Sequence, residues 1–290
     1  MPHGSRTRFG RWWWALPGVL LVFSVHYLAT AFGGVYAFTD WSGIGGFDWI
    51  GLQNFGEIFS DSSMLRALWN TLFLAFGSVL VANVLGLALA LGLNRGLKTR
   101  YWLRVLFFMP VVLSPLATAY VWRYIFEFNG PINTALAAVG LGDFARAWVA
   151  DPTFAIWVVL LVIAWQTTGI PMVIYMAGLA GVPQEMEEAA AIDGASTLQR
   201  LWFVILPTLR PAIAISTILG IVNGLRIFDP IMAITGGGPA GVTENLATVV
   251  YKESFALGNF GYGAALALIL TVIIIFFAVI QQRITQGPKD

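Results

Sequence analysis

The sequence predicts an all-α membrane protein in which six apolar helices cross a bilayer. Of its 290 residues, 58% are hydrophobic and 11% are charged, so the chain lacks the charged surface that a soluble protein of this size needs. The mean hydropathy is +0.77. The apolar runs lack the two-residue alternation of barrel strands, which favours a helical bundle. Six runs approach or exceed the ~20 residues that a span needs, roughly residues 12–38, 68–93, 105–125, 154–180, 212–235 and 256–281.

The first run is interpreted as a retained span rather than as a signal peptide. Basic residues precede it, as in a signal peptide, but the run over 12–38 is too long for the apolar part of such a peptide. No convincing small-residue cleavage site is present. The stretches between spans are too short for a globular domain, so any function outside the membrane must be performed by loops or by other subunits.

The placement of basic residues predicts the orientation in the membrane. Three arginines precede the first span, four basic residues lie between the second and third, two lie between the fourth and fifth, and two follow the sixth. The loops on the opposite side carry four basic residues. Because Lys and Arg mark cytoplasmic loops, both termini and the loop at 181–211 are predicted to be cytoplasmic.

Several classes of protein and site are excluded or unsupported by composition. The chain has no cysteine, which excludes disulfides and cysteine-ligated metals. Its two histidines, His3 and His26, have no neighbours at ligand spacing, so no metal site is expected. No basic patch interleaved with aromatic residues indicates a nucleic-acid partner.

A compact polar segment, residues 183–207, separates the fourth span from the fifth. Pro183 suits the first turn of a short helix that continues through Ile192. Gly194 can adopt the left-handed conformation that ends a helix. The segment therefore predicts a helix and a turn at the membrane surface.

The second half of this segment also carries helix signals. Ser196 and Gln199 fit a capping box, and Pro207 ends the second helix. Glu185 and Glu188, in the first helix, lie one turn apart and offer carboxylates to a basic partner. On these signals alone, an ordinary solvated loop is an equally good interpretation.

The spacing of this segment resembles the EAA loop of ABC importer permeases, which follows the pattern EAA-x3-G-x9-I-x-LP. Val204 stands where that pattern usually has isoleucine, a difference of one methylene. The loop also precedes the last two spans, as it does in that family. The matching residues are Glu188, Ala189, Ala190, Gly194, Val204, Leu206 and Pro207.

The resemblance implies the type I ABC importer permease fold, with six transmembrane helices and a cytoplasmic coupling helix. Residues 1–67 would form a cytoplasmic tail, the first helix and an outer loop, 68–282 a five-helix core containing the coupling loop 183–207, and 283–290 a cytoplasmic tail. The coupling helix would dock on a separate ATPase through Glu185, Glu188, Ala189, Ala190, Asp193, Gly194, Leu206 and Pro207.

The same resemblance implies the partners. The chain has no GxxxxGK[ST] phosphate loop, so ATP and magnesium are expected in partner subunits, and the chain itself is expected to hold no cofactor and to be no enzyme. A second homologous permease, two ATP-binding subunits and an extracytoplasmic solute-binding protein would complete the importer. The expected location is the cytoplasmic membrane of a bacterium or archaeon.

A second region resembles the permeases that import maltose, trehalose, other oligosaccharides and glycerol phosphate. Gly236–Pro239 is a helix-breaking turn, which a plain connector would also need. The resemblance implies a sugar or sugar-like substrate. It rests on Phe228-Asp229-Pro230, Thr235 through Pro239, Thr243, Leu246 and Tyr251 through Phe255.

Polar residues inside the spans are the candidates for the substrate pathway. A charge at mid-membrane is costly, so it should face a partner or a wet cavity. Arg226 and Asp229 are expected to lie on one helix and to pair. The alternative is that such residues tie helices together. The candidates are Asn223, Arg226, Gln166, Trp165, Thr168, Asp229, Asn83 and Ser114.

A transporter of a different class, driven by an ion gradient and carrying a small polar solute, is the alternative function. It would need acidic residues at mid-bilayer, and Asp229 is the acidic candidate within a predicted span. It would have no use for the spacing between Glu188 and Pro207. A membrane-embedded enzyme is less favoured because neither HExxH nor GxSxG occurs.

Overall fold

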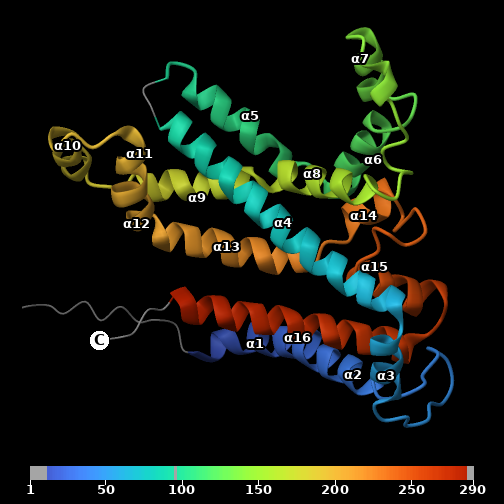
Figure 1. Ribbon diagram of the computed structural model, residues 1–290. Helices are drawn as coiled ribbons and strands as arrows, with labels where there is room; N and C mark the ends of the chain where they lie inside the picture. Colours follow the sequence, from blue (N-terminus) through green and yellow to red (C-terminus); the bar gives the residue numbers. More distant parts are fainter. Residues whose placement is uncertain (1–11, 95–96, 286–290) are drawn as a thin grey trace, which may run out of the picture. The chain divides into compact units, whose positions relative to one another are not determined.

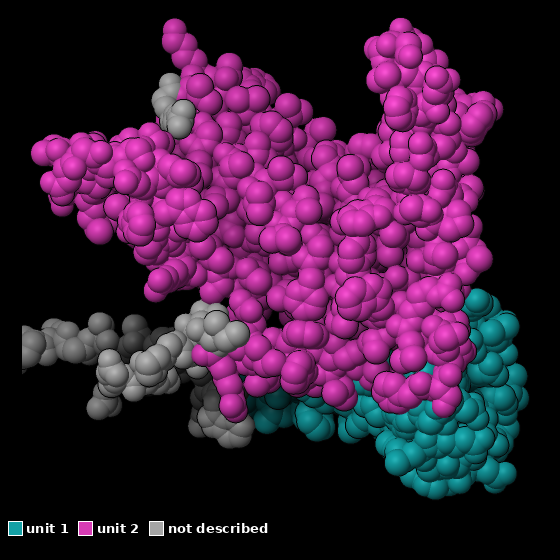
Figure 2. Space-filling model, in the orientation of Figure 1, with its two compact units in different colours: residues 1–58, 250–268 teal, residues 59–249, 269–290 magenta. Residues whose placement is uncertain are grey.

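The computed structural model describes residues 12–94 and 97–285. Within these ranges the regular structure is helical, apart from an isolated bridge between Thr39 and Trp49. The chain forms two compact units, residues 1–58 with 250–268 and residues 59–249 with 269–290 (Figure 2). The predicted basic N-terminal tail, Arg95 and Lys289 lie outside the described residues.

The first unit contains the first span. One apolar helix of 24 residues, Trp13–Tyr36, qualifies as a membrane span. Its side chains are exposed along most of its length, as expected of a helix that faces lipid. The span is made of η1 (Trp12–Ala15), α1 (Leu16–Val22), the π-helical η2 (Phe23–Leu28) and α2 (Ala29–Tyr36) (Figure 1).

An aromatic loop follows this span. Asn54, in α3 (Gln53–Ser60), holds the loop by donating from Nδ2 to the carbonyls of Ala37 and Thr39, at 3.0 Å each. The rings of Tyr36 and Trp41 stack with their centroids 4.2 Å apart. The loop is therefore ordered by one buried amide and by ring stacking.

The second unit is built around α4 (Ser62–Leu93), a helix of 32 residues. Asp61 caps its start by accepting a hydrogen bond from the Ser63 backbone N–H at 2.7 Å. Helices α8 (Ala155–Thr167), α9 (Gly169–Leu179) and α13 (Arg210–Leu225) pack against it (Figure 1).

In the described part of the chain, groups of buried apolar residues form the core of this unit. One joins α4 to α6 (Pro115–Ile125), α8 and α14 (Asp229–Ile234), another joins α4 to α9 and the start of α13, and a further one joins α4 to the rest of α13. Small residues let the backbones approach, as at Gly224, where an added Cβ would lie 3.0 Å from Ala75 Cα. Small residues at such crossings are typical of membrane bundles.

The third predicted span, 105–125, is not one straight helix. It consists of α5 (Arg100–Val112) and α6 (Pro115–Ile125), which meet at 99°. Pro115 restricts the residue before it to extended conformations, so the helix stops there. Ser114 then caps α6 by accepting from the Ala117 N–H at 3.5 Å.

The fifth predicted span, 212–235, is also interrupted. Helix α13 ends at Leu225, three residues follow without helical structure, and α14 covers Asp229–Ile234. The non-helical backbone is satisfied from elsewhere, because Asn245 donates from Nδ2 to the Ile227 carbonyl at 2.6 Å. Such backbone is tolerated at membrane depth where its polar groups find partners in the protein.

The remaining helices connect or complete these spans. Outside the loop at 181–211 they are α7 (Pro131–Ala138), η3 (Gly142–Phe144), α15 (Leu246–Tyr251), η5 (Lys252–Ala256) and α16 (Phe260–Thr285). Within the described residues, four helices are long and apolar enough to cross a membrane, and two bent pairs raise the number to six. This agrees with the six spans that the sequence predicts. The division of the chain at residues 67 and 282 stays a prediction.

Candidate functional site

The loop between the fourth and fifth spans begins with helix α10 (Gln184–Ile192). The helix ends in a Schellman motif. The N–H of Gly194 donates to the Ala191 carbonyl at 3.1 Å, and the N–H of Ala195 donates to the Ala190 carbonyl at 2.9 Å. Gly194 has a φ of +80°, which confirms the predicted left-handed turn.

Helix α10 presents acidic and small side chains to its surroundings. Glu185, Glu188, Ala189 and Asp193 are exposed, and Ala190 is half-buried. Gln184 donates from Nε2 to Glu188 Oε1 at 2.8 Å, one turn away. Exposed carboxylates on a short rigid helix can pair with a basic surface. Their docking role stays a prediction.

The second helix of the loop starts as predicted. Ser196 Oγ accepts from the Gln199 N–H at 3.3 Å, and Gln199 Oε1 accepts from the Ser196 N–H at 2.7 Å. This reciprocal capping box opens α11 (Thr197–Arg200). Pro183, in contrast, is the N-cap residue of the preceding helix rather than part of its first turn.

The end of the loop contains the predicted Leu206 and Pro207. Both lie in α12 (Leu206–Thr208), which follows the π-helical η4 (Leu201–Ile205). The chain then bends by 70° into α13. The helical run from Thr197 includes Pro207 and ends one residue later, at Thr208, so the predicted end at Pro207 is displaced by one residue.

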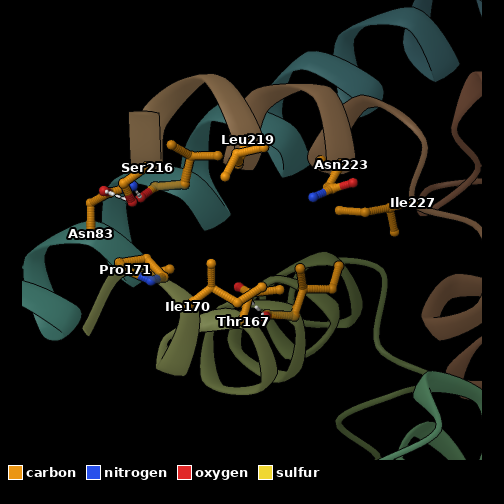
Figure 3. A pocket seen from close by; sticks show the side chains of 13 residues that line it. Asn83, Thr167, Ile170, Pro171, Ser216, Leu219, Asn223 and Ile227 are labelled. Atoms are coloured by element: carbon orange, nitrogen blue, oxygen red, sulfur yellow. Dashed lines mark hydrogen bonds between the residues drawn. The ribbon is translucent and has the colours of Figure 1, made fainter. Parts of the chain in front are cut away.

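A cavity of about 80 Å³ lies where α4, α8, α9 and α13 meet (Figure 3). Two of the predicted pathway residues, Asn83 and Asn223, line it, and no residue of its lining is charged. Thr167 and Ser216 contribute hydroxyl groups. The rest of the lining is mainly apolar and includes Val79, Ile163, Ile170, Leu219 and Ile227.

The two asparagines of this cavity differ in their partners. Asn83 Oδ1 accepts hydrogen bonds from Tyr175 Oη and from Ser216 Oγ, the latter at 2.7 Å, and Asn83 Nδ2 donates to the Val79 carbonyl at 2.7 Å. Asn83 therefore ties α4, α9 and α13 together. Asn223 points into the cavity, and its amide makes no hydrogen bond within the described chain (Figure 3).

The other six pathway candidates lie outside the cavity lining, and four of them make structural contacts instead. Gln166 is buried and donates to the Leu113 carbonyl at 3.2 Å, at the break between α5 and α6. Thr168 donates to the Ala164 carbonyl of its own helix at 2.6 Å. Trp165 packs edge-on against the ring of a neighbouring tryptophan, and Ser114 caps α6. These contacts are structural, and a substrate role for the four stays a prediction.

Arg226 and Asp229 do not share a helix, so the predicted pairing along one helix is wrong. Helix α13 ends at Leu225, Arg226 is its C-cap residue, and Asp229 starts α14. Both side chains are exposed, and no ion pair joins them in the part of the chain that the structure describes. The interruption at Ile227 separates the two residues that a continuous helix would have placed one turn apart.

Sequence reasoning missed Tyr175 and Ser216. Tyr175 is a single polar group in an apolar run, Ser216 stands beside Thr217 in another, and neither has a local partner that would mark it. Their common partner, Asn83, is 92 and 133 residues away. The available signal was the position of both residues on the buried side of their helices, where a polar group needs a partner.

Comparison with known families decides where this chain belongs. Residues 82–289 match the family described as "Binding-protein-dependent transport system inner membrane component". The chain belongs to this family. It is a membrane-embedded permease, and its relatives are transport permeases rather than enzymes. Membership leaves the ion-coupled alternative without support.

Two relatives illustrate the likeness over most of the permease. The multiple sugar-binding transport system permease protein MsmF of Streptococcus mutans is 34% identical over 278 residues, which cover 95% of each chain. The trehalose/maltose transport system permease protein MalF of Thermococcus litoralis is 30% identical over 242 residues, covering 83% of this permease and 81% of that chain.

Solved structures confirm the fold. A chain of a bacterial ABC transporter involved in the import of the acidic polysaccharide alginate is similar, with a TM-score of 0.82 and 20% identity, covering 96% of this permease and 95% of that chain. A chain of the MetNI methionine ABC transporter has a TM-score of 0.56 and 17% identity, covering 77% and 94%. The permease therefore has the predicted ABC importer fold.

Proposed function

We propose that this permease carries a sugar or oligosaccharide across the cytoplasmic membrane as one subunit of an ATP-driven importer. The observation that carries the proposal is the family match over residues 82–289, which contains the whole coupling loop. The names of the relatives support a sugar: one is called a multiple sugar-binding permease and another a trehalose/maltose permease.

The chemistry of the cavity supports the same substrate class. Its lining combines apolar walls with hydroxyl and amide groups and holds no charged side chain. Sugars need hydrogen-bonding groups for their hydroxyls and apolar surface for their C–H faces, which such a lining offers. The amide of Asn223, which makes no hydrogen bond among the described residues, is the group that we assign to a substrate hydroxyl.

Helix α10 is the element that we assign to energy coupling. It is exposed, it carries Glu185 and Glu188, and its end is fixed by the turn at Gly194. It would dock on an ATP-binding subunit, which would hold ATP and magnesium. Nucleotide binding there would favour one conformer of the bundle over the other, as alternating access requires.

The complete importer would contain this permease, a second homologous permease, two ATP-binding subunits and an extracytoplasmic solute-binding protein. The distribution of basic residues supports a cytoplasmic location for both termini and for the loop at 181–211, which would be the side of the ATPase.

The test of the coupling assignment compares two glycines of the same conformation. Gly194 and Gly140 have φ values of +80° and +78°, and an added Cβ would meet nothing within 4 Å at either position. Gly194→Val and Gly140→Val therefore introduce similar backbone strain, about 1–2 kcal/mol for a residue in the left-handed region. Each variant is purified in mild detergent, and the chains that co-purify are identified by mass spectrometry.

We expect Gly194→Val to lose the ATPase and Gly140→Val to retain it, with both variants folded. Recovery of an ATPase, a second permease and a binding protein with the unmodified chain supports the importer. The binding protein is then screened against sugars to name the substrate. Equal ATPase recovery with both variants would contradict the coupling assignment.

A further inference from the structure

A groove separate from the cavity opens between α5 and α9. Its volume is about 250 Å³, and its walls are almost entirely apolar. Val105 and Phe108 contribute from α5, and Met172, Val173 and Met176 from α9, with Arg104 as the charged member. Methionine side chains adapt their shape to a flexible apolar occupant.

Arg104 is incompletely satisfied at this groove. One of its terminal nitrogens donates to the Leu93 carbonyl at 3.3 Å, while its Nε is buried without a hydrogen-bond partner among the described residues. Arg100 and Arg104 lie over the ring of Tyr101, at 4.9 and 5.7 Å from its centroid. No carboxylate of the described chain lies within ion-pair distance of either arginine.

The outer face of α5 at this level is apolar and uncovered. Tyr101, Trp102 and Val105 are 63%, 80% and 63% exposed. Tyr and Trp concentrate at the level of lipid headgroups, so the two arginines beside them lie at the same level. The start of α5 is at the same end of the second unit as α10 (Figure 1).

We propose that this groove binds one anionic phospholipid, with an acyl chain along Met172, Val173 and Met176 and the headgroup phosphate between Arg100 and Arg104. No carboxylate of the described chain neutralises the two arginines, and a phosphate can accept hydrogen bonds from both. Basic pockets between transmembrane helices on the cytoplasmic side suit anionic headgroups. The site is additional to the proposed transport function. It rests on that proposal only for the orientation that places the site in the cytoplasmic leaflet.

The experiment compares lipid retention by the purified full-length permease. The protein is equilibrated in mixed micelles with equal amounts of phosphatidylglycerol and phosphatidylcholine, and bound lipids are counted by native mass spectrometry. Two variants address the site: Arg100→Gln with Arg104→Gln removes the cations, and Val173→Trp fills the groove. Arg123→Gln is the matched control. Arg123 is an exposed helical arginine in α6 that pairs with Glu127 and does not line the groove.

We expect the unmodified permease to prefer phosphatidylglycerol. The double arginine variant should lower retention of phosphatidylglycerol about 25-fold, or about fivefold for each arginine, following the typical attraction of one basic residue to an anionic lipid surface. Val173→Trp should lower retention of both lipids, and Arg123→Gln should change neither. Val173→Trp keeps both arginines, so it tests the site even if the double variant unfolds.

Two results would overturn the proposal. One is equal binding of the two lipids by the unmodified permease, which would remove the role of the arginines. The other is crosslinking of Val173→Cys to a second permease in the assembled importer without phosphatidylglycerol, which would show that protein covers the groove. Loss of phosphatidylglycerol with intact ATPase recovery would leave the proposed transport function standing.

Discussion

The coupling loop is held by hydrogen bonds between residues close in sequence, whereas the crossing of α4, α9 and α13 around Asn83 is held by hydrogen bonds between residues far apart. In the loop, the hydrogen bonds that define α10, Gly194 and the capping box join residues no more than five positions apart. At the crossing, Asn83 bonds residues 92 and 133 positions away. The loop can therefore keep its shape while it moves as a unit, whereas the crossing fixes three spans relative to one another.

The largest expected effect is at Gly86, in the crossing. A Cβ there would lie 2.6 Å from Pro171 Cβ and 2.8 Å from the Met172 backbone nitrogen, so α4 and α9 would have to separate. Gly86→Val should destabilise the permease by about 1–3 kcal/mol or more, the cost of overpacking a core. Gly92, in the same helix, has no atom within 4 Å of its Cβ position and provides the control. Equal SDS-unfolding midpoints for the two valine variants would contradict the close packing.

The second prediction concerns Asn83 itself. Asn83→Leu removes the acceptor of Tyr175 and Ser216, and hydrogen bonds between membrane helices are worth about 0.6–1.7 kcal/mol each. We expect a loss of about 1–3 kcal/mol in unfolding free energy. Asn223→Ala, in the same cavity, should change stability by less than about 0.5 kcal/mol while raising the substrate concentration for half-maximal uptake. If Asn223→Ala lowers the unfolding free energy as much as Asn83→Leu does, Asn223 has a structural role like that of Asn83, and the proposed difference between the two asparagines is wrong.

The third prediction tests whether the loop is set by local conformation. Gly194→Asn should retain more ATPase than Gly194→Val, because asparagine enters the left-handed region more readily than a β-branched residue. The expected difference in strain is about 1 kcal/mol, or roughly fivefold in ATPase recovery. Equal recovery would mean that the side chain at this position, rather than the turn, decides docking.

The smallest effect is expected at Ser196. Ser196→Ala removes one half of the capping box and should cost about 1 kcal/mol in the stability of the first turn of α11. Because the bond is local, hydrogen exchange should speed up in residues 196–200, and the unfolding midpoint should stay unchanged. A fall in the global midpoint would show that the loop is coupled to the bundle more tightly than its contacts indicate.

The sequence by itself determined the features that depend on neighbouring residues. Hydrophobic run length set the spans, glycine set the turn at residue 194, and the Ser196 and Gln199 pair set the capping box. The turn and the capping box act within a few residues, and the structure has both. The number of spans also agrees with the structure, although the third and the fifth are interrupted. The spacing of the loop residues also identified the family, because it preserves the geometry of a short helix and its stop.

Tertiary structure alone decided which polar residues meet. The sequence placed Arg226 and Asp229 on one helix because the apolar run continues to Thr235, but the amide of Asn245 satisfies the Ile227 carbonyl and allows the helix to end at Leu225. It likewise offered Asn83 as a substrate ligand without its partners Tyr175 and Ser216. In a membrane bundle a polar group is satisfied by whichever helix packs against it, and that neighbour is set by the whole fold.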